Sequence, residues 1–450
     1  MNKRVLMIAK CSDAGRMYTA ALILDHIAHI CGHFIKLSIS KTYSFLNLVT
    51  AVVICQPVVV YLIENGFLFK SIDVCSSLLK RFDTEVGIDA VLLHEKGEKR
   101  GKDLLWILET QKLLYFCLRV SVKNSRFYAK FKSQILDACR RFVQYCFEWS
   151  DIQPIQKGCT NLDEDAYKYL FDSFQNLFRI FTEFVKLFIG CDEVATEAIE
   201  WFLERFAIDI ARISGEDPNV PVFRKIINYC NVDKDKFLIF NISHRVLIDI
   251  FMDSCARGTL TKNIKERVLG DSTMLMWIAR PAVTAISYIS TTFELPRLEM
   301  TKPFKQVRDI YFEPELIEYL QMQDIHIIQI LMSHLDPELL LKYFLFNISP
   351  SIREHSDFIQ PISSILCSQE FYGGYNLKFL FVLIYNAFLE RHFIGVSENT
   401  EYPFIEGQLV NHLALGDRTL IELRNNIFVY RTIWNSDKGV RNMNVDQALE

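Results

Sequence analysis

The sequence predicts an all-α fold in which pairs of antiparallel helices stack into a right-handed superhelix. Glycine and proline supply only 29 of the 450 residues (17 and 12), whereas phenylalanine alone supplies 35. Strands, tight turns and phosphate-binding loops need glycine, because glycine enters the positive-φ region without steric cost. Helices joined by short connections need about one such residue at each end. Apolar residues that recur at three- and four-residue steps along the chain point to the same fold class.

The bulk composition limits the class of protein. Hydrophobic residues make up 50% of the chain and charged residues 23%, which is enough apolar material for a continuous core and too much for a disordered chain. The length exceeds the size at which one compact core keeps growing, so several domains or an elongated stack is expected. The net charge of -4 lacks the basic excess that a nucleic-acid backbone demands. A nucleic-acid partner is therefore not expected.

The twelve cysteines are scattered and contain no Cys-x-x-Cys pair, so the sequence predicts no disulfide framework. The apolar stretch at residues 5–9 is interrupted by Lys10, which argues against a secretory signal peptide. Both observations favour a reducing compartment. We expect the cytoplasm, with the nucleus as an alternative, and no cofactor.

The first helix carries His26, His29 and His33, with Cys31 between the last two. The spacing of His29 and His33 is the i, i+4 step used by two zinc ligands on a helix. The glutamate of the metalloprotease motif is absent, and Gly32 is expected to end the helix. We interpret the histidines as polar side chains beside an apolar face. The alternative is a metal site, and with it a metal-dependent hydrolase.

Residues 42–63 form an uncharged stretch of 22 residues, long enough to cross a bilayer. Pro57 interrupts the stretch, and Glu64, Asn65 and Gly66 follow it as a turn signal. These features predict a buried helix that breaks at Pro57 and is followed by a second helix. The alternative is a membrane-associated helical protein anchored near residues 42–63.

The next elements follow from charge and apolar spacing. Residues 94–103 are rich in charge and contain two glycines, so they predict an exposed loop, and Asp103 can cap the helix that follows. A further helix is predicted from apolar residues on one face. These residues are Tyr128, Phe131, Ile135, Cys139, Phe142 and Cys146.

Residues 165–213 predict an antiparallel pair of helices. Apolar side chains recur at helical spacing on both sides of Gly190, which can end the first helix, and Asp192 can cap the second. The apolar face of the second helix is predicted to consist of Ile199, Phe202, Leu203, Phe206, Ile210 and Ile213.

Four further signals mark helix ends in the second half of the chain. Ser243 can cap a helix, Gly270 and Asp271 separate the next two, and the dipeptide at residues 280–281 is a break before proline. The Asp-Pro-Glu sequence at residues 336–338 combines a capping carboxylate, a proline at the first helical position and an acidic first turn.

Polar, proline-containing segments predict the domain organisation. We expect N-terminal helical repeats over residues 1–150, central helical hairpins over 160–293 and C-terminal repeats over 310–434. Residues 435–450 are expected to form a polar tail. The three helical parts are expected to join in one continuous solenoid.

Residues 236–243 (KFLIFNIS) and 342–349 (KYFLFNIS) repeat each other, and internal repetition in a helical chain is typical of a solenoid. In both segments an asparagine, Asn241 or Asn347, lies four residues after an aromatic residue and is followed by isoleucine and serine.

These segments resemble the armadillo and HEAT classes of helical repeats, in which an apolar helix ends in an asparagine with an aromatic residue one turn earlier. Residues 61–68 are similar to the helix, glycine turn and helix junction of an armadillo unit. The resemblance implies a concave surface that binds the extended backbone of a protein partner. The residues it places on that surface are Asn241, Asn347, Asn386, Phe237 and Tyr343. The alternative is that each asparagine simply ends a helix.

No G-x-G-x-x-G, G-x-x-x-x-G-K-[ST] or G-x-S-x-G motif occurs in the chain. The sequence therefore predicts a non-enzymatic scaffold or adaptor that binds protein partners through a helical-repeat surface. It does not indicate the identity of the partner or the oligomeric state.

Overall fold

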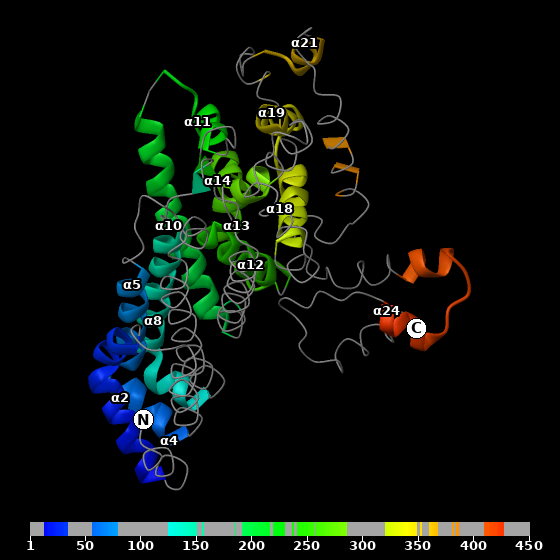
Figure 1. Ribbon diagram of the computed structural model, residues 1–450. Coiled ribbons are helices and arrows are strands. Elements are labelled where there is room, and N and C mark those ends of the chain that lie inside the picture. The colour runs from blue at the N-terminus through cyan, green and yellow to red at the C-terminus, as the bar shows by residue number, and fades with distance from the viewer. Residues whose placement is uncertain are drawn as a thin grey trace. The chain divides into compact units, whose positions relative to one another are not determined.

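The computed structural model confirms the all-α class, because helices dominate the residues that it describes (Figure 1). Two strands of two residues each, β1 (Ile155–Gln156) and β2 (Lys236–Phe237), are the extended elements in this part of the chain. The superhelical arrangement stays a prediction. The described residues are 13–34, 56–79, 125–150, 155–156, 185, 191–216, 219–229, 236–237, 241–256, 258–285, 320–348, 352, 360–367, 380–381, 384–385, 387 and 409–426.

The chain divides into two compact units, Met1–Ala198 and Ile199–Glu450. The division falls inside helix α10 (Asp192–Glu216). The boundary predicted between residues 293 and 310 lies outside the described residues. The division into segments 1–150, 160–293, 310–434 and 435–450 therefore stays a prediction.

The first unit contains α2 (Asp13–Phe34), α4 (Gln56–Glu64), α5 (Phe67–Leu79) and α8 (Ser125–Ser150). Helix α2 packs against α4 and α5, and α5 packs against α8. Helix α2 continues through Gly32, so the prediction that this glycine ends the helix was wrong. A single glycine costs a helix only about 1 kcal/mol relative to alanine, which is too little to stop it without a competing cap.

The predicted turn between α4 and α5 is confirmed. Gly66 has a φ of 76°, and its N–H donates to the carbonyl oxygen of Ile63 over 3.0 Å. The side-chain amide of Asn65 donates to the carbonyl oxygen of Tyr61 over 2.8 Å. Pro57 lies in the first turn of α4, where a missing N–H is tolerated.

The part of the uncharged stretch that precedes Gln56 lies outside the described residues. Among the helices that are described, none combines the length and apolar character needed to cross a bilayer.

Helix α8 buries the face that its apolar spacing predicts. The buried side chains of this face are Phe131, Ile135, Cys139, Phe142 and Cys146, and the side chain of Tyr128 lies outside the described residues. Tyr145 and Trp149 extend the buried face, with ring centroids 6.2 Å apart in an edge-to-face arrangement. The backbone leaves helical geometry at Phe131, where φ is -115° and ψ is 17°.

In the part of the chain that the structure describes, the second unit contains most of α10 followed by shorter helices. They include α11 (Val222–Tyr229), α12 (Ile242–Ala256), α13 (Lys262–Leu269), α14 (Ser272–Ile278), α18 (Gln321–His334), α19 (Pro337–Ile348), α21 (Ile362–Cys367) and α24 (Leu420–Asn426). Helix α18 packs against α12, α14 and α19, and Figure 1 shows α14 and α18 adjacent to each other. The predicted apolar face of α10 is confirmed at Ile199, Phe202, Leu203, Phe206 and Ile213, which are buried, whereas Ile210 is only half-buried.

Two predicted helix starts are confirmed by capping contacts. The carboxylate of Asp271 accepts from the N–H groups of Thr273 and Met274, and Gly270 ends the preceding helix. The carboxylate of Asp336 accepts from the N–H of Glu338 over 3.0 Å and from that of Leu339 over 3.1 Å. Each contact satisfies a backbone donor that the first turn of a helix leaves open.

Three predicted boundaries were wrong by one or two residues. Helix α10 includes Asp192, and the carbonyl of Cys191 accepts its first helical hydrogen bond. Helix α12 begins at Ile242 rather than after Ser243. The break before proline falls at Ala279, and helical residues resume at Arg280. Backbone polar groups near a helix end can often be satisfied in either of two adjacent registers.

The two similar segments have different structures. Lys236 and Phe237 form β2, and Asn241 precedes α12 with a φ of 28°. The matching Asn347 lies in the last turn of α19. The sequence repeat is therefore not a structural repeat, and the wider resemblance to armadillo and HEAT units stays a prediction.

Candidate functional site

The structure places His26 on an exposed part of α2. Because α2 continues to Phe34, positions 26, 29 and 33 come to one side of the helix. The side chains of His29 and His33 lie outside the described residues. Among the side chains that are described, no group of three or more histidine, cysteine or acidic residues is close enough to hold a metal ion.

Asn241 and Asn347 are both buried in the second unit, at 3% and 2% exposure. The side-chain oxygen of Asn241 accepts from Arg280 Nη2 over 3.2 Å. The side-chain nitrogen of Asn347 donates to the carbonyl oxygen of Tyr343 over 2.6 Å. These contacts are all within the second unit, so they account for both asparagines as parts of its interior.

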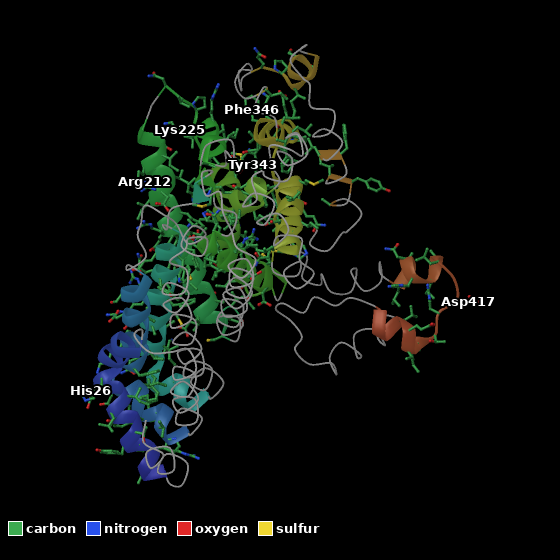
Figure 2. All side chains as sticks on the ribbon, viewed as in Figure 1. His26, Arg212, Lys225, Tyr343, Phe346 and Asp417 are labelled. Carbon is green, nitrogen blue, oxygen red and sulfur yellow. The ribbon has the colours of Figure 1, made fainter. Side chains whose placement is uncertain are left out.

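Tyr343, labelled in Figure 2, is also fully buried. Its hydroxyl donates to the carbonyl oxygen of Met276 over 2.9 Å. The bond joins α19 to α14. Asn386 and the side chain of Phe237 lie outside the described residues. A role of these residues in binding a partner stays a prediction.

Replacing Tyr343 with phenylalanine is expected to lower the free energy of unfolding by about 1 kcal/mol, because the buried carbonyl of Met276 loses its hydroxyl partner. Urea denaturation measures the change. Tyr18 is 66% exposed, so Tyr18→Phe serves as the matched control and should change little. Equal effects of the two substitutions would contradict the prediction.

Helix α12 is unusual because every residue from Asn241 to Cys255 is buried. A helix buried on all sides is normally apolar throughout. Helix α12 instead carries His244, Arg245, Asp249 and Asp253 within an aliphatic sequence. Charged side chains are almost never fully buried unless they are paired, so these residues need partners within the unit.

The partners of Arg245 and Asp249 lie along α18. We use the term polar seam for Arg245, Asp249 and Asp253 of α12 together with Gln323 and Asp324 of α18. All five are buried, with exposures between 1% and 7%. The three α12 residues are spaced i, i+4 and i+8, which puts them on one face of the helix.

Arg245 is the centre of the polar seam. Its Nη1 donates to Asp324 Oδ1 over 3.0 Å, and its Nη2 donates to Asp324 Oδ2 over 3.3 Å. Nη1 also lies 3.2 Å from Gln323 Oε1, and Gln323 Nε2 donates back to the carbonyl oxygen of Arg245 over 3.4 Å. The guanidinium therefore meets one carboxylate at two points and joins α12 to α18.

Asp249 lies one turn after Arg245 and one turn before Asp253. Burial raises the pKa of Asp249 from 3.8 to about 7, against the opposing effects of a hydrogen bond from the Gln323 side chain and the charge of Arg245. The nearby Asp253 raises the pKa further. A carboxyl group in this setting holds its proton close to neutral pH.

His244, on the same helix, packs against aromatic side chains of the second unit. Its ring stacks on Phe206 with centroids 4.3 Å apart, and the ring of Trp277 lies at 5.8 Å. Burial, followed by the charge of Arg280, lowers the pKa of His244 well below its usual value. The imidazole is therefore neutral, and Nδ1 lies 3.4 Å from the carbonyl oxygen of Ile278, which it can meet as a donor.

The arrangement can join two helices and hold a proton. It does not present a reactive group to solvent, since each member of the polar seam is at least nine-tenths buried. Sequence reasoning missed these residues because it treated the segment after Ser243 only as an apolar helix. The signal that could have revealed them is the repeated charge at positions 245, 249 and 253 within a strongly apolar segment.

The described residues thus define an all-α protein with an internal polar seam. No protein-family model matches the chain, and no curated protein or solved structure matches it either.

Proposed function

We propose that the protein is a non-enzymatic scaffold or adaptor that binds other proteins through its helical surface. The observation that supports this proposal is the distribution of side chains. The charged residues of the polar seam are enclosed, whereas large apolar side chains are exposed on helices near the C-terminus. The polar seam does not reach solvent, whereas these apolar side chains are accessible to a partner.

Half of the large apolar residues that are exposed in the described part of the chain lie in the C-terminal helix pair, which we define as residues 409–426. Five large apolar side chains within this segment are between 45% and 77% exposed. These are Val410, Leu413, Leu415, Leu420 and Ile421. Single exposed apolar residues are ordinary on any protein, but this number in a short segment is typical of a contact surface.

The C-terminal helix pair is specified by its own sequence. Gly416 has a φ of 136° between the two helices, next to Asp417 (Figure 2). The second helix begins with a capping box. The N–H of Thr419 donates to Glu422 Oε2 over 2.8 Å, and the N–H of Glu422 lies 3.3 Å from Thr419 Oγ1.

The chemistry of this segment favours a protein as the partner. Its acidic residues, Asp417 and Glu422, are balanced by Arg418 and Arg424. A surface without a basic excess does not favour a polyanion such as a nucleic acid. Aliphatic side chains flanked by charges of both signs match the composition of protein interfaces.

The experiment that tests the proposal places a photo-crosslinking amino acid at position 415 or, as a control, at the exposed position 411 in the full chain. Irradiation in cells should give a discrete protein adduct from position 415 and much less from position 411. The double substitution Leu420→Asp and Ile421→Asp should reduce the adduct at least tenfold, because it places two charges in the contact. The matched substitution Asn411→Asp should leave it unchanged.

Two outcomes would overturn the proposal. The first is the absence of a discrete protein adduct from position 415. The second is co-sedimentation with phosphatidylcholine and phosphatidylserine vesicles that the same double substitution abolishes, since the surface would then serve a membrane. Circular dichroism of each variant separates loss of contact from loss of helix.

A further inference from the structure

The polar seam between α12 and α18 contains a carboxyl group, that of Asp249, for which the described residues provide no ion pair. Asp249 is 7% exposed. On its own helix it is flanked by Arg245 and Asp253, and from α18 the side chain of Gln323 provides its hydrogen bond. Asp249 therefore lies near one cation, one further carboxyl group and one amide.

The single guanidinium in the seam is already engaged by another carboxylate. Arg245 meets both oxygens of Asp324, at 3.0 and 3.3 Å. An ionised Asp249 would add a further negative charge close to Asp253 in a region that excludes water. Carboxylates that share a buried site resist simultaneous ionisation, because Coulomb repulsion and desolvation act in the same direction.

The amide of Gln323 connects Asp249 to the ion pair. Gln323 Oε1 accepts from Arg245 Nη1, and Gln323 Nε2 donates to the carbonyl oxygen of Arg245 while bonding to the Asp249 carboxyl. A change of charge on Asp249 thus acts on the same side chain that orients Arg245. Because α18 also packs against α14 and α19, a change at the seam reaches three neighbouring helices of the second unit.

We propose that Asp249 is a proton-binding site within the fold, in which protonation allows the carboxyl to stay buried between α12 and α18 and ionisation loosens the seam. The device is distinct from partner binding at the C-terminal helix pair and does not depend on it. It would make the packing of the second unit responsive to pH near neutrality.

The direction of the pH effect follows from linkage. Because the pKa of Asp249 is raised to about 7 in the folded chain from its ordinary 3.8, the folded state binds the extra proton between these values. The stability that this group contributes is fully present below pH 3.8. It falls as the pH rises from 3.8 to about 7 and is absent above that pH. His244 acts in the opposite sense. Its lowered pKa means that stability is lost as the pH falls below its ordinary 6.5.

Amide hydrogen exchange of α18 in the full chain tests the proposal. After correction for the chemical exchange rate, the Asp249 contribution should lower the protection of α18 about tenfold between pH 6 and pH 8, and His244 should offset part of this fall near pH 6. Asp249→Asn replaces the protonated carboxyl with a neutral group of the same shape and should abolish this fall, so that only the opposing dependence from His244 remains. Asp73 is an exposed acidic residue of the first unit, so Asp73→Asn should retain the full pH dependence.

A measurement on the unaltered chain covers the case in which Asp249→Asn fails to fold. Infrared difference spectra should show the carbonyl band of a protonated carboxyl at pH 6 and its loss at pH 8. The proposal is overturned if no such band changes. It is also overturned if α18 exchange keeps the same pH dependence in Asp249→Asn as in the unaltered chain.

Discussion

Replacing Asp324 with alanine is expected to lower the free energy of unfolding of the second unit by about 3–5 kcal/mol. The substitution leaves the guanidinium of Arg245 buried at 3% exposure without the carboxylate that it meets at two points. The large expected effect is the desolvation of an unpaired charge rather than the loss of the attraction itself. Urea denaturation followed by tryptophan fluorescence, with hydrogen exchange of α12, measures the change.

The same physics predicts a rescue. The double substitution Arg245→Met and Asp324→Leu removes both charges and keeps most of the apolar volume, so its stability should approach that of the unaltered chain. A surface pair provides the control. Lys130 and Glu64 form an exposed ion pair of 2.7 Å, and Lys130→Ala should cost less than about 1 kcal/mol. A double substitution as damaging as Asp324→Ala would contradict the desolvation argument.

The sequence predicts the local features of this fold because each depends on a few neighbouring residues. Asp271 and Asp336 accept hydrogen bonds from backbone N–H groups two and three residues ahead, so their capping role can be deduced from position alone. Gly66 adopts the positive φ that its place after a helix indicates. The buried face of α10 likewise follows from apolar spacing within one helix.

The polar seam could not be predicted in the same way. Arg245 and Asp324 are 79 residues apart, and no local rule connects them. The two similar segments also show that nearly identical local sequences can adopt different conformations. Asn241 precedes a helix and Asn347 lies within one, although nearly the same residues surround both. Tertiary contacts decide these conformations, since short-range propensities differ by less than about 1 kcal/mol per residue.

Replacing Phe206 with alanine is expected to lower the free energy of unfolding by about 3–5 kcal/mol, through lost apolar burial and the cavity that remains. Phe206 is 1% exposed and stacks on His244, so it joins α10 to α12. The cavity also weakens the enclosure of the imidazole. Because burial is the largest cause of the lowered pKa of His244, this pKa should rise toward its ordinary 6.5 in the variant.

The change in the pKa of His244 tests whether Phe206 keeps the imidazole neutral or only fills volume in the core. Phe206→Leu retains much of the apolar volume and should cost less than half as much as Phe206→Ala. Urea denaturation measures the stabilities, and the nuclear magnetic resonance titration of the His244 ring protons measures the pKa. If the pKa of His244 is unchanged in Phe206→Ala, then Phe206 does not control the solvation of the imidazole. The remaining contacts with Trp277 and Ile278 would then be sufficient to exclude water.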